Sequence, residues 1–304
     1  MTLRHSALAT LVALIWGLNF VVIDQGLEGF PPFLFLALRF LLVSIPAVFF
    51  IPRPDVGWSV ILTVGAFLSL GQFTFPYLAL HLGMPAGLAS LVLQAQVMLT
   101  VILAAGVLGE RPSRRQVIGV VVGMLGLMLV ISAHGMSAPL IPVFVTLLAA
   151  TSWAIGNVLS RRSKVASGLG LVVWSGLVVP IPAAALSLLI DGPDEVQRAL
   201  THISTAAVLS TLYTAIFASL VGYGIWNSLM AKYPTSSVVP FTLLVPVVGI
   251  AAAWAFQDEV PARAEIWGGV IMLAGLAVAT IAWERSRKGR AIDSPREPST
   301  TSAS

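Results

Sequence analysis

The sequence predicts an all-α integral membrane protein with ten transmembrane helices in two inverted five-helix repeats. The first observation behind this prediction is composition: 57% of the 304 residues are hydrophobic and only 10% are charged. A soluble domain carries about 25% charged residues, because its surface faces water. The second and third observations are a series of apolar segments and a turn that occurs twice. The chain contains no cysteine, which excludes disulfides, thiolate catalysis and iron–sulfur ligation.

Ten apolar segments have the length of about 20 residues that a helix needs to cross a bilayer. In chain order they cover residues 6–25, 31–51, 57–79, 85–108, 114–132, 139–160, 169–190, 205–230, 234–256 and 263–283. The first segment could be a signal peptide, but Asn19 interrupts it and no small-x-small cleavage site follows, so a retained helix is expected. Prolines are expected to break or kink two segments. These are Pro180 and Pro182 in the seventh, and Pro240 and Pro246 in the ninth.

The two halves of the chain repeat each other at a spacing of 149 residues. Between Ala104 and Leu127 this shift aligns 24 positions without a gap, and eight of them are identical. The turn at 109–112 then falls on 258–261. A shared turn at a shared spacing favours an internal repeat over chance. We therefore expect a first repeat at 6–133, a second at 139–284, and a disordered cytoplasmic tail at 285–304. The alternative is a membrane scaffold that retains an old duplication.

The distribution of charge predicts the orientation. Fourteen of the 17 Lys and Arg residues lie in segments on the same side as the N-terminus, and basic residues favour the cytoplasmic side. Both termini are therefore expected in the cytoplasm of a bacterial-type cell with the chain in its inner membrane. Because a repeat of five helices is odd-numbered, the second copy must be inverted. Inverted repeats build secondary transporters, with the substrate site near the midplane of the bilayer.

Polar and aromatic residues inside the apolar segments predict a central substrate pocket with amide and indole donors. The candidates are Trp16, Asn19, Gln72, Gln94, Gln96, Trp153, Asn157, Tyr223, Trp226 and Asn227. Trp16 and Asn19 share one helix face, as do Trp153 and Asn157 in the second half. The alternative is that Asn and Gln hold helices together and Trp marks the membrane interface. Gln94 and Gln96 are about 200° apart on a helix, so they cannot both line one cavity.

Arg39 is the charged residue expected deepest in the bilayer. It lies eight positions after Pro31, which is about 12 Å along a helix. A charge at that depth is costly and is by default functional. If the substrate is an amino acid, Arg39 is hypothesised to hold its carboxylate through two parallel hydrogen bonds. The alternative is a structural Arg that satisfies the carbonyls of a broken helix.

Several motifs resemble the drug/metabolite transporter superfamily, and within it the EamA-type exporters of O-acetylserine and cysteine. They are WGLNFVVI at 16–23, LRF at 38–40, GMPAGLASLVLQAQ at 83–96, GER at 109–111, VGYGIW at 221–226 and LLVPVVG at 243–249. The resemblance covers nearly all of residues 1–285 and implies ten helices in two inverted repeats that export small amino-acid-like metabolites. Asp24 departs from the pattern, because Lys is expected there.

Other classes of protein fit the sequence less well. An enzyme is not expected, because the four histidines, His5, His81, His134 and His202, lie near segment ends without metal-ligand spacing. No P-loop is present, so ATP does not drive the protein directly. We expect no cofactor, no metal and no nucleic acid; the partners are a small-molecule substrate and the lipid bilayer. Asp24 is a candidate for proton coupling. A drug carrier, an importer or a nucleotide-sugar carrier on the same fold remains an alternative.

Overall fold

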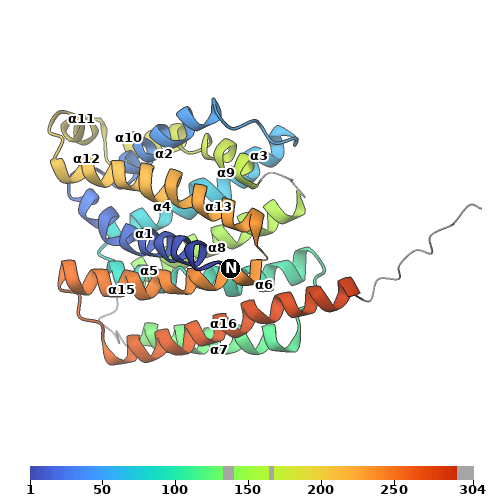
Figure 1. The fold of residues 1–304 in the computed structure, drawn as a ribbon. Coiled ribbons are helices and arrows are strands. Elements are labelled where there is room, and N and C mark those ends of the chain that lie inside the picture. Colours follow the sequence, from blue (N-terminus) through green and yellow to red (C-terminus); the bar gives the residue numbers. More distant parts are fainter. Residues whose placement is uncertain (133–139, 164–167, 234, 293–304) are drawn as a thin grey trace, which may run out of the picture.

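The computed structural model is all-helical over the residues it describes, which are 1–132, 140–163, 168–233 and 235–292. Its long helices lie side by side in a bundle (Figure 1). The elements of the first half are α1 (Leu3–Leu27), α2 (Pro32–Val48), α3 (Trp58–Val64), η1 (Gly65–Gly71), α4 (Gln72–His81), α5 (Ala86–Val92), α6 (Ala95–Val107) and α7 (Arg114–Ser132). The elements of the second half are α8 (Leu140–Arg162), α9 (Gly168–Gly176), α10 (Pro180–Ile190), α11 (Pro193–Thr201), α12 (Thr205–Leu212), η3 (Tyr213–Val221), α13 (Gly222–Lys232), α14 (Thr235–Val238), η4 (Val239–Leu243), α15 (Leu244–Gln257) and α16 (Arg263–Ile292).

Eight helices in the described residues are long and apolar enough to cross a membrane. The shorter apolar helix α2 and the long helix α16 coincide with the two other predicted segments, 31–51 and 263–283. A multi-pass helical membrane protein is therefore confirmed, while the number ten and the inverted arrangement stay predictions. Helix α16 also continues through 285–292, where the sequence predicted disorder. Arg, Lys and Ala in that segment are good helix formers, and residues 293–304 lie outside the described part of the chain.

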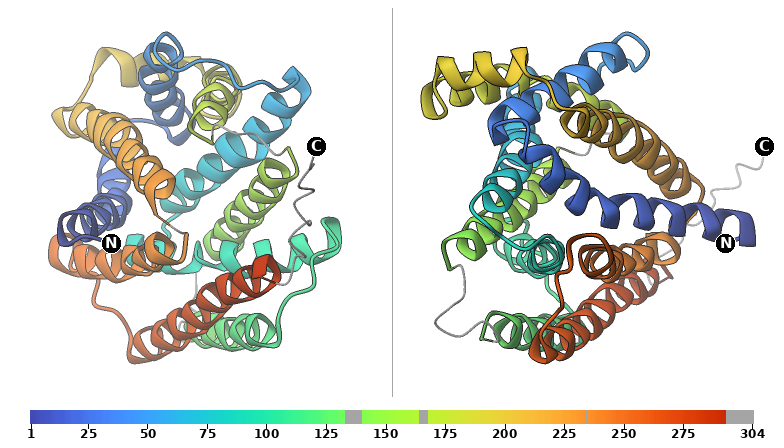
Figure 2. Two further views of the ribbon diagram at one scale, coloured as in Figure 1. Left: turned by 45° about the vertical axis from the view of Figure 1, so that its right-hand side comes forward. Right: turned by 90° about the vertical axis from the view of Figure 1, so that its left-hand side faces the viewer.

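Helices α7 and α16 form a tightly packed antiparallel pair along one edge of the bundle (Figures 1 and 2). A Cβ atom added at Gly119 would lie 2.5 Å from the backbone N of Ala279, and one added at Gly268 would lie 2.8 Å from the backbone O of Gly126. Only glycine permits backbones to approach so closely, which is a common way for helices to pack in membranes. Gly119 and Gly123 form a GxxxG pair in the sequence, a spacing that predicts close helix packing, and the structure confirms this packing for Gly119.

Several predicted segments are discontinuous helices. The prolines act as expected: α9 ends at Gly176 before α10 begins at Pro180, and the 3₁₀ segment η4 separates α14 from α15. Segment 85–108 is also broken, between α5 and α6, although neither Pro nor Gly stands at the break. Apolar length predicts such a segment as one span, so this break could not be predicted from hydropathy. Non-helical backbone at membrane depth is tolerated only where protein or water satisfies it.

Two segments are π-helices, which sequence periodicity does not show. They are η1 between α3 and α4, and η3 between α12 and α13. Both belong to corresponding positions of the two halves, because they interrupt the third and the eighth predicted segments. A π-helix leaves backbone carbonyls displaced from their usual partners, and such segments frequently occur at functional sites.

The helices pair in the same way in the two halves. Helix α1 packs along α15 and α8 along α6, and likewise α13 packs against α1 and α4 against α8. Because α7 and α16 are antiparallel, the turns that precede them lie at opposite ends of the bundle. We call one end the Asp24 end: it holds the last turn of α1, the first turn of α5 and the turn at 258–262. The other is the Glu110 end, which holds the turn at 108–113 and the last turn of α8.

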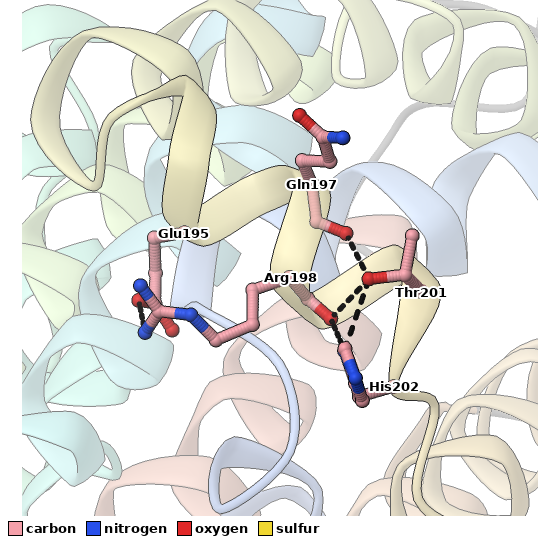
Figure 3. Close-up of polar contacts among 5 residues, drawn as sticks. All are labelled: Glu195, Gln197, Arg198, Thr201 and His202. Atoms are coloured by element: carbon pink, nitrogen blue, oxygen red, sulfur yellow. Dashed lines mark hydrogen bonds and ion pairs between the residues drawn. The ribbon is translucent and has the colours of Figure 1, made fainter.

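A short helix that the sequence did not predict, α11, connects α10 to α12. Its polar side chains bond within the helix itself (Figure 3): Arg198 donates to Glu195 at 2.5 Å, and Thr201 donates to the Gln197 carbonyl oxygen at 2.9 Å. The His202 ring nitrogen Nδ1 lies 3.3 Å from the Arg198 carbonyl oxygen. Val196 and Ala199 are buried on the other face. The polar side chains of α11 thus bond to one another on the exposed face while its apolar side chains are buried. This arrangement is that of an amphipathic helix and does not indicate a binding site.

Candidate functional site

Arg39 lies in the interior of the bundle, on the buried face of α2. Its side chain is 2% exposed. The guanidinium donates from Nη1 to the Tyr77 hydroxyl at 3.2 Å, and from Nε and Nη2 to the Ser219 hydroxyl at 3.3 and 3.1 Å. Its Cζ also lies 4.4 Å from the centre of the Phe73 ring, a cation–π contact. No acidic side chain in the described part of the chain forms an ion pair with Arg39.

The contact between Arg39 and Ser219 connects the charge to the π-helix η3. Ser219 donates its own hydroxyl to the carbonyl oxygen of Thr214, five residues earlier, at 2.8 Å. The structural interpretation of Arg39 required it to bond the carbonyls of a broken helix, but its hydrogen bonds in the described part of the chain are to side-chain hydroxyls. Arg39 thus contacts a hydroxyl that bonds to such a carbonyl. The guanidinium is surrounded by neutral hydroxyls and rings, so the charge remains without a fixed counter-ion.

An aromatic cluster of α1 and α13 contacts η3 next to Ser219, the partner of Arg39. The Trp16 ring centre is 5.2 Å from that of Tyr223 and 5.3 Å from that of Trp226. The Trp16 indole nitrogen donates to the Ala218 carbonyl oxygen at 2.9 Å. That donor was predicted to face the pocket, but the displaced carbonyls of η3 occupy it. Trp16 can therefore offer a substrate only its ring.

The two π-helices are supported in the same manner from the opposite half of the chain. Ser152 on α8 donates to the Phe67 carbonyl oxygen in η1 at 2.8 Å, as Trp16 on α1 donates into η3. Each contact needs a glycine beside it. A Cβ added at Gly222 would lie 2.7 Å from the Trp16 indole nitrogen, and one at Gly71 would collide with the Ser152 hydroxyl. The π-helices are therefore built into the contact between the halves.

A second polar group, the amide cluster, consists of Gln96, Thr100 and Asn157. The Asn157 side-chain nitrogen donates to the Gln96 side-chain oxygen at 3.3 Å and to the Thr100 hydroxyl at 3.4 Å. Gln94 instead donates to the Thr242 carbonyl oxygen in η4 at 3.3 Å. The two glutamines thus have different partners, and Gln94 lies at the break between α5 and α6. The Gln94 contact is of the helix-joining kind that the sequence left as an alternative.

Two buried oxygen atoms near these groups have no hydrogen-bond partner among the described residues. They are Oδ1 of Asn19, one turn after Trp16 on α1, and Oγ1 of Thr74, which follows Phe73 on α4. A buried polar atom without a partner costs about 1–3 kcal/mol. Such atoms are available to a ligand, and Asn19 was among the residues predicted to contact a substrate.

The remaining predicted residues occupy separate places. Asn227 donates to the carbonyl oxygen of Tyr223 in its own helix at 2.7 Å. Trp153 packs against the main hydrophobic core. Gln72 is buried where α4 begins, directly after η1. Sequence reasoning missed Phe73, Tyr77, Ser219 and Thr100, because hydroxyl and aromatic residues are common in membrane helices and only the structure places them beside Arg39 or Asn157.

Charged groups at the two ends of the bundle bond between the halves. At the Asp24 end, Gln257 donates to the Asp24 carboxylate at 2.5 Å. There the Glu259 carboxylate also accepts the backbone N–H groups of Ala86 and Gly87 at 3.1 and 3.2 Å. At the Glu110 end, Glu110 forms an ion pair with Arg161. No group of three metal-ligating side chains occurs among the described residues.

The fold and these groups define a class: a multi-pass helical membrane protein whose interior holds a charged group among hydroxyls and aromatic rings. The chain belongs to the EamA-like transporter family, which matches residues 4–132 and again residues 140–281. The resemblance found in the sequence motifs is therefore confirmed for the family.

Two relatives match almost the whole chain. A probable amino-acid metabolite efflux pump of Salmonella typhimurium is 42% identical over 296 residues, covering 95% of this chain and 99% of that protein. A protein of the same description from Escherichia coli strain K12 is 40% identical with the same coverage. A probable terminal-alkyne amino-acid exporter of Streptantibioticus cattleyicolor is 28% identical over 63% of each chain. A solved crystal structure that is 21% identical has a TM-score of 0.63, covering 97% of this chain and 100% of that one, which shows the fold alone.

Proposed function

We propose that this protein exports small amino-acid-like metabolites, of the O-acetylserine or cysteine type, across the inner membrane by alternating access. The observation that carries the proposal is the buried Arg39, which bonds to hydroxyls and rings but to no carboxylate in the described part of the chain. A buried charge without a counter-ion is costly. An amino-acid substrate supplies that counter-ion as its own carboxylate. The two relatives that match almost the whole chain support this substrate class through their descriptions.

The proposed site lies between the halves. Arg39 holds the substrate carboxylate, the rings of Trp16, Tyr223 and Trp226 contact the rest of the molecule, and the free oxygen of Asn19 accepts from its ammonium group. Gln94, Gln96 and Asn157 bond between the first and second halves, to η4 and across α6 and α8, and hold the contact between the halves. In this proposal the site lies between two inverted repeats, residues 6–133 and 139–284, which rock about it during transport. Both termini lie in the cytoplasm.

The test uses the difference between an amino acid and its methyl ester, which lacks the carboxylate. Arg39→Lys keeps the charge but replaces a planar fork by a point charge. We expect it to weaken binding of the free acid by about 10- to 150-fold, as for the loss of a charge-assisted pair of about 1.5–3 kcal/mol. Binding of the ester should change little. An equal loss for both ligands would assign Arg39 a structural role.

The orientation is tested by cysteine labelling, since the chain has no cysteine of its own. A cysteine at Ser113 should react with an impermeant reagent only from the cytoplasmic side, and one at Ala262 only from the outside. Labelling of both from one face would contradict the inverted repeat.

Proton coupling through Asp24 has its own test: Asp24→Asn should abolish efflux driven by a pH gradient and leave substrate exchange intact. Unchanged gradient dependence would remove Asp24 from the coupling.

A further inference from the structure

The turn that occurs twice in the sequence places one glutamate at each end of the bundle. Glu110 and Glu259 are 149 residues apart and are identical positions of the repeat. Each contacts the opposite half of the chain. Glu110 pairs with Arg161 on α8, and Glu259 accepts the N–H groups of Ala86 and Gly87 at the start of α5. The same residue of the repeat therefore joins the two halves at both ends.

A second pair of positions faces these glutamates. Asp24 lies eight residues after Trp16 on α1, and Arg161 lies eight residues after Trp153 on α8. Both stand in the last turns of helices that pack in equivalent ways, α1 along α15 and α8 along α6. Arg161 bonds to the turn that follows α6, and Asp24 bonds to Gln257, the last residue of α15.

The charges at these equivalent positions are opposite. At the Glu110 end a cation faces the turn glutamate, so the contact is attractive. At the Asp24 end a carboxylate occupies the equivalent position, and its partner Gln257 stands two residues before Glu259. Glu28 follows Asp24 by one helical turn, so this end gathers carboxylates, which repel one another. The Gln257 amide is the neutral donor that bonds to the Asp24 carboxylate, and its own oxygen is buried without a hydrogen-bond partner within the ranges that the structure describes.

We propose that these two contacts are the gates of the transport pathway, and that their unequal charge sets which gate opens more readily. The inference rests on the proposed function in one respect, the alternating access of two repeats. The Glu110 end is closed by an ion pair. The Asp24 end is closed by a hydrogen bond that works against repulsion between carboxylates. The resting protein therefore opens at the Asp24 end more often than an ion pair there would permit.

The gates can be measured without any substrate, by amide hydrogen exchange of the full chain in lipid nanodiscs. Opening at the Asp24 end exposes the N–H groups of Ala86 and Gly87 that Glu259 protects, and opening at the Glu110 end exposes the turn at 108–113. In an alternating mechanism a stronger closure at one end raises opening at the other. Exchange must therefore change in opposite directions at the two ends.

Asp24→Lys supplies an ammonium beside Glu259 and reverses the sign of the interaction. We expect exchange at Ala86 and Gly87 to slow about two- to fivefold, as for a partly exposed ion pair, and exchange at 108–113 to quicken by a similar factor. Glu259→Gln is the second variant. It weakens the two charge-assisted hydrogen bonds to Ala86 and Gly87, and this loss exceeds the gain from relieving repulsion with Asp24 at a partly exposed site. Exchange should therefore quicken at Ala86 and Gly87 and slow at 108–113.

Glu28→Lys is the matched control, because it makes the same change of charge at the same end, one turn later and outside the hydrogen bond. It should shift exchange by less than Asp24→Lys at both ends. Opposite changes at the two ends in Asp24→Lys and Glu259→Gln support the gates. A change confined to the altered end, no change, or an equal effect of Glu28→Lys overturns them. Since no substrate is present, failure here is distinct from failure of the Arg39 experiment.

Discussion

The α7–α16 pair and the region around Arg39 are built on opposite principles. In the pair, glycines face backbone atoms: a Cβ at Gly275 would lie 2.6 Å from the Gly119 backbone oxygen. Around Arg39, hydroxyls and rings surround a charge, a π-helix interrupts regular backbone, and polar atoms remain unpaired nearby. Close backbone contact leaves no room for movement or for a ligand. Incomplete polar contacts and broken helices, by contrast, permit movement of the helices and binding of a ligand.

This difference assigns the two regions different roles. The pair α7–α16 joins the last helix of each half into one fixed edge of the bundle (Figure 2). The helices that carry the polar groups, α1, α2, α4 and α13, lie away from that edge, and α4 and α13 directly follow the π-helices η1 and η3. We infer that the glycine pair is the fixed part of the molecule and that the movement needed for transport occurs among the polar helices.

The largest expected effect comes from breaking the fixed part. Gly119→Val places side-chain atoms where a Cβ alone would lie 2.5 Å from the Ala279 backbone nitrogen. Backbone on both helices must shift, and overpacking of this kind costs about 3 kcal/mol or more. We expect a large fall in the thermal unfolding temperature of the purified protein.

Gly106→Ala is the matched control for that experiment. Gly106 lies in α6, and an added Cβ would meet no atom within 4 Å. Because glycine inside a helix is less favourable than alanine by about 1 kcal/mol, this variant should unfold at a slightly higher temperature. Equal destabilisation by both variants would show that the backbone contact is unimportant and that glycine content alone matters.

A smaller effect is expected from Ser219→Ala in the polar region. It removes the acceptor for Nε and Nη2 of Arg39 and the donor to the Thr214 carbonyl oxygen. Leaving such buried groups unpaired costs about 1–3 kcal/mol, so both stability and amino-acid binding should fall. Ser228→Ala is the control, since Ser228 is exposed and, among the described residues, its hydroxyl bonds to the Ile225 carbonyl oxygen in its own helix. If the two variants behave alike, Ser219 does not support Arg39.

The contrast between the two regions also separates what the sequence could predict from what it could not. Apolar length and proline positions predicted the helices and the breaks at α10 and η4, and the spacing of Gly119 and Gly123 predicted close helix packing. These features depend on local chemistry. Arg39 was identified from its depth alone, because a charge in an apolar segment is visible in the sequence.

The partners of Arg39 could not be predicted, because they come from α4 and η3, which are distant in the chain. The π-helices escaped prediction for a related reason. Their carbonyls bond to Trp16 and Ser152 from the opposite half, so tertiary contact rather than local propensity stabilises them. The sequence assigned the indole donor of Trp16 to a substrate because it does not show that a carbonyl of η3 accepts from this donor. The break between α5 and α6 is marked by neither Pro nor Gly.

Asn19→Leu probes the unpaired oxygen on α1. The substitution removes a buried acceptor that the protein leaves unsatisfied, so the free energy of unfolding without substrate should rise by about 1 kcal/mol. If that oxygen accepts from the substrate ammonium, binding of an amino acid should weaken by about tenfold, the equivalent of one hydrogen bond to a charged group. Higher stability with unchanged binding would remove Asn19 from the site and leave its unpaired oxygen without a functional explanation.

The smallest expected effect belongs to Thr74→Val, which changes a hydroxyl to a methyl group of nearly the same size. Thr74 carries a buried hydroxyl without a partner and follows Phe73, whose ring lies 4.4 Å from the Arg39 Cζ. Replacing an unsatisfied group by an apolar one of the same shape is nearly neutral or stabilising, by less than about 1 kcal/mol. Thr63→Val is the matched control, because Thr63 is exposed and its hydroxyl donates to the Ser59 carbonyl oxygen at 2.5 Å. Thermal unfolding of the two variants should differ in sign, with Thr74→Val raised and Thr63→Val unchanged or lowered. A clear fall in stability for Thr74→Val would mean that the Thr74 hydroxyl has a hydrogen-bond partner in the membrane. The contacts of the polar region would then be as complete as those of the α7–α16 pair.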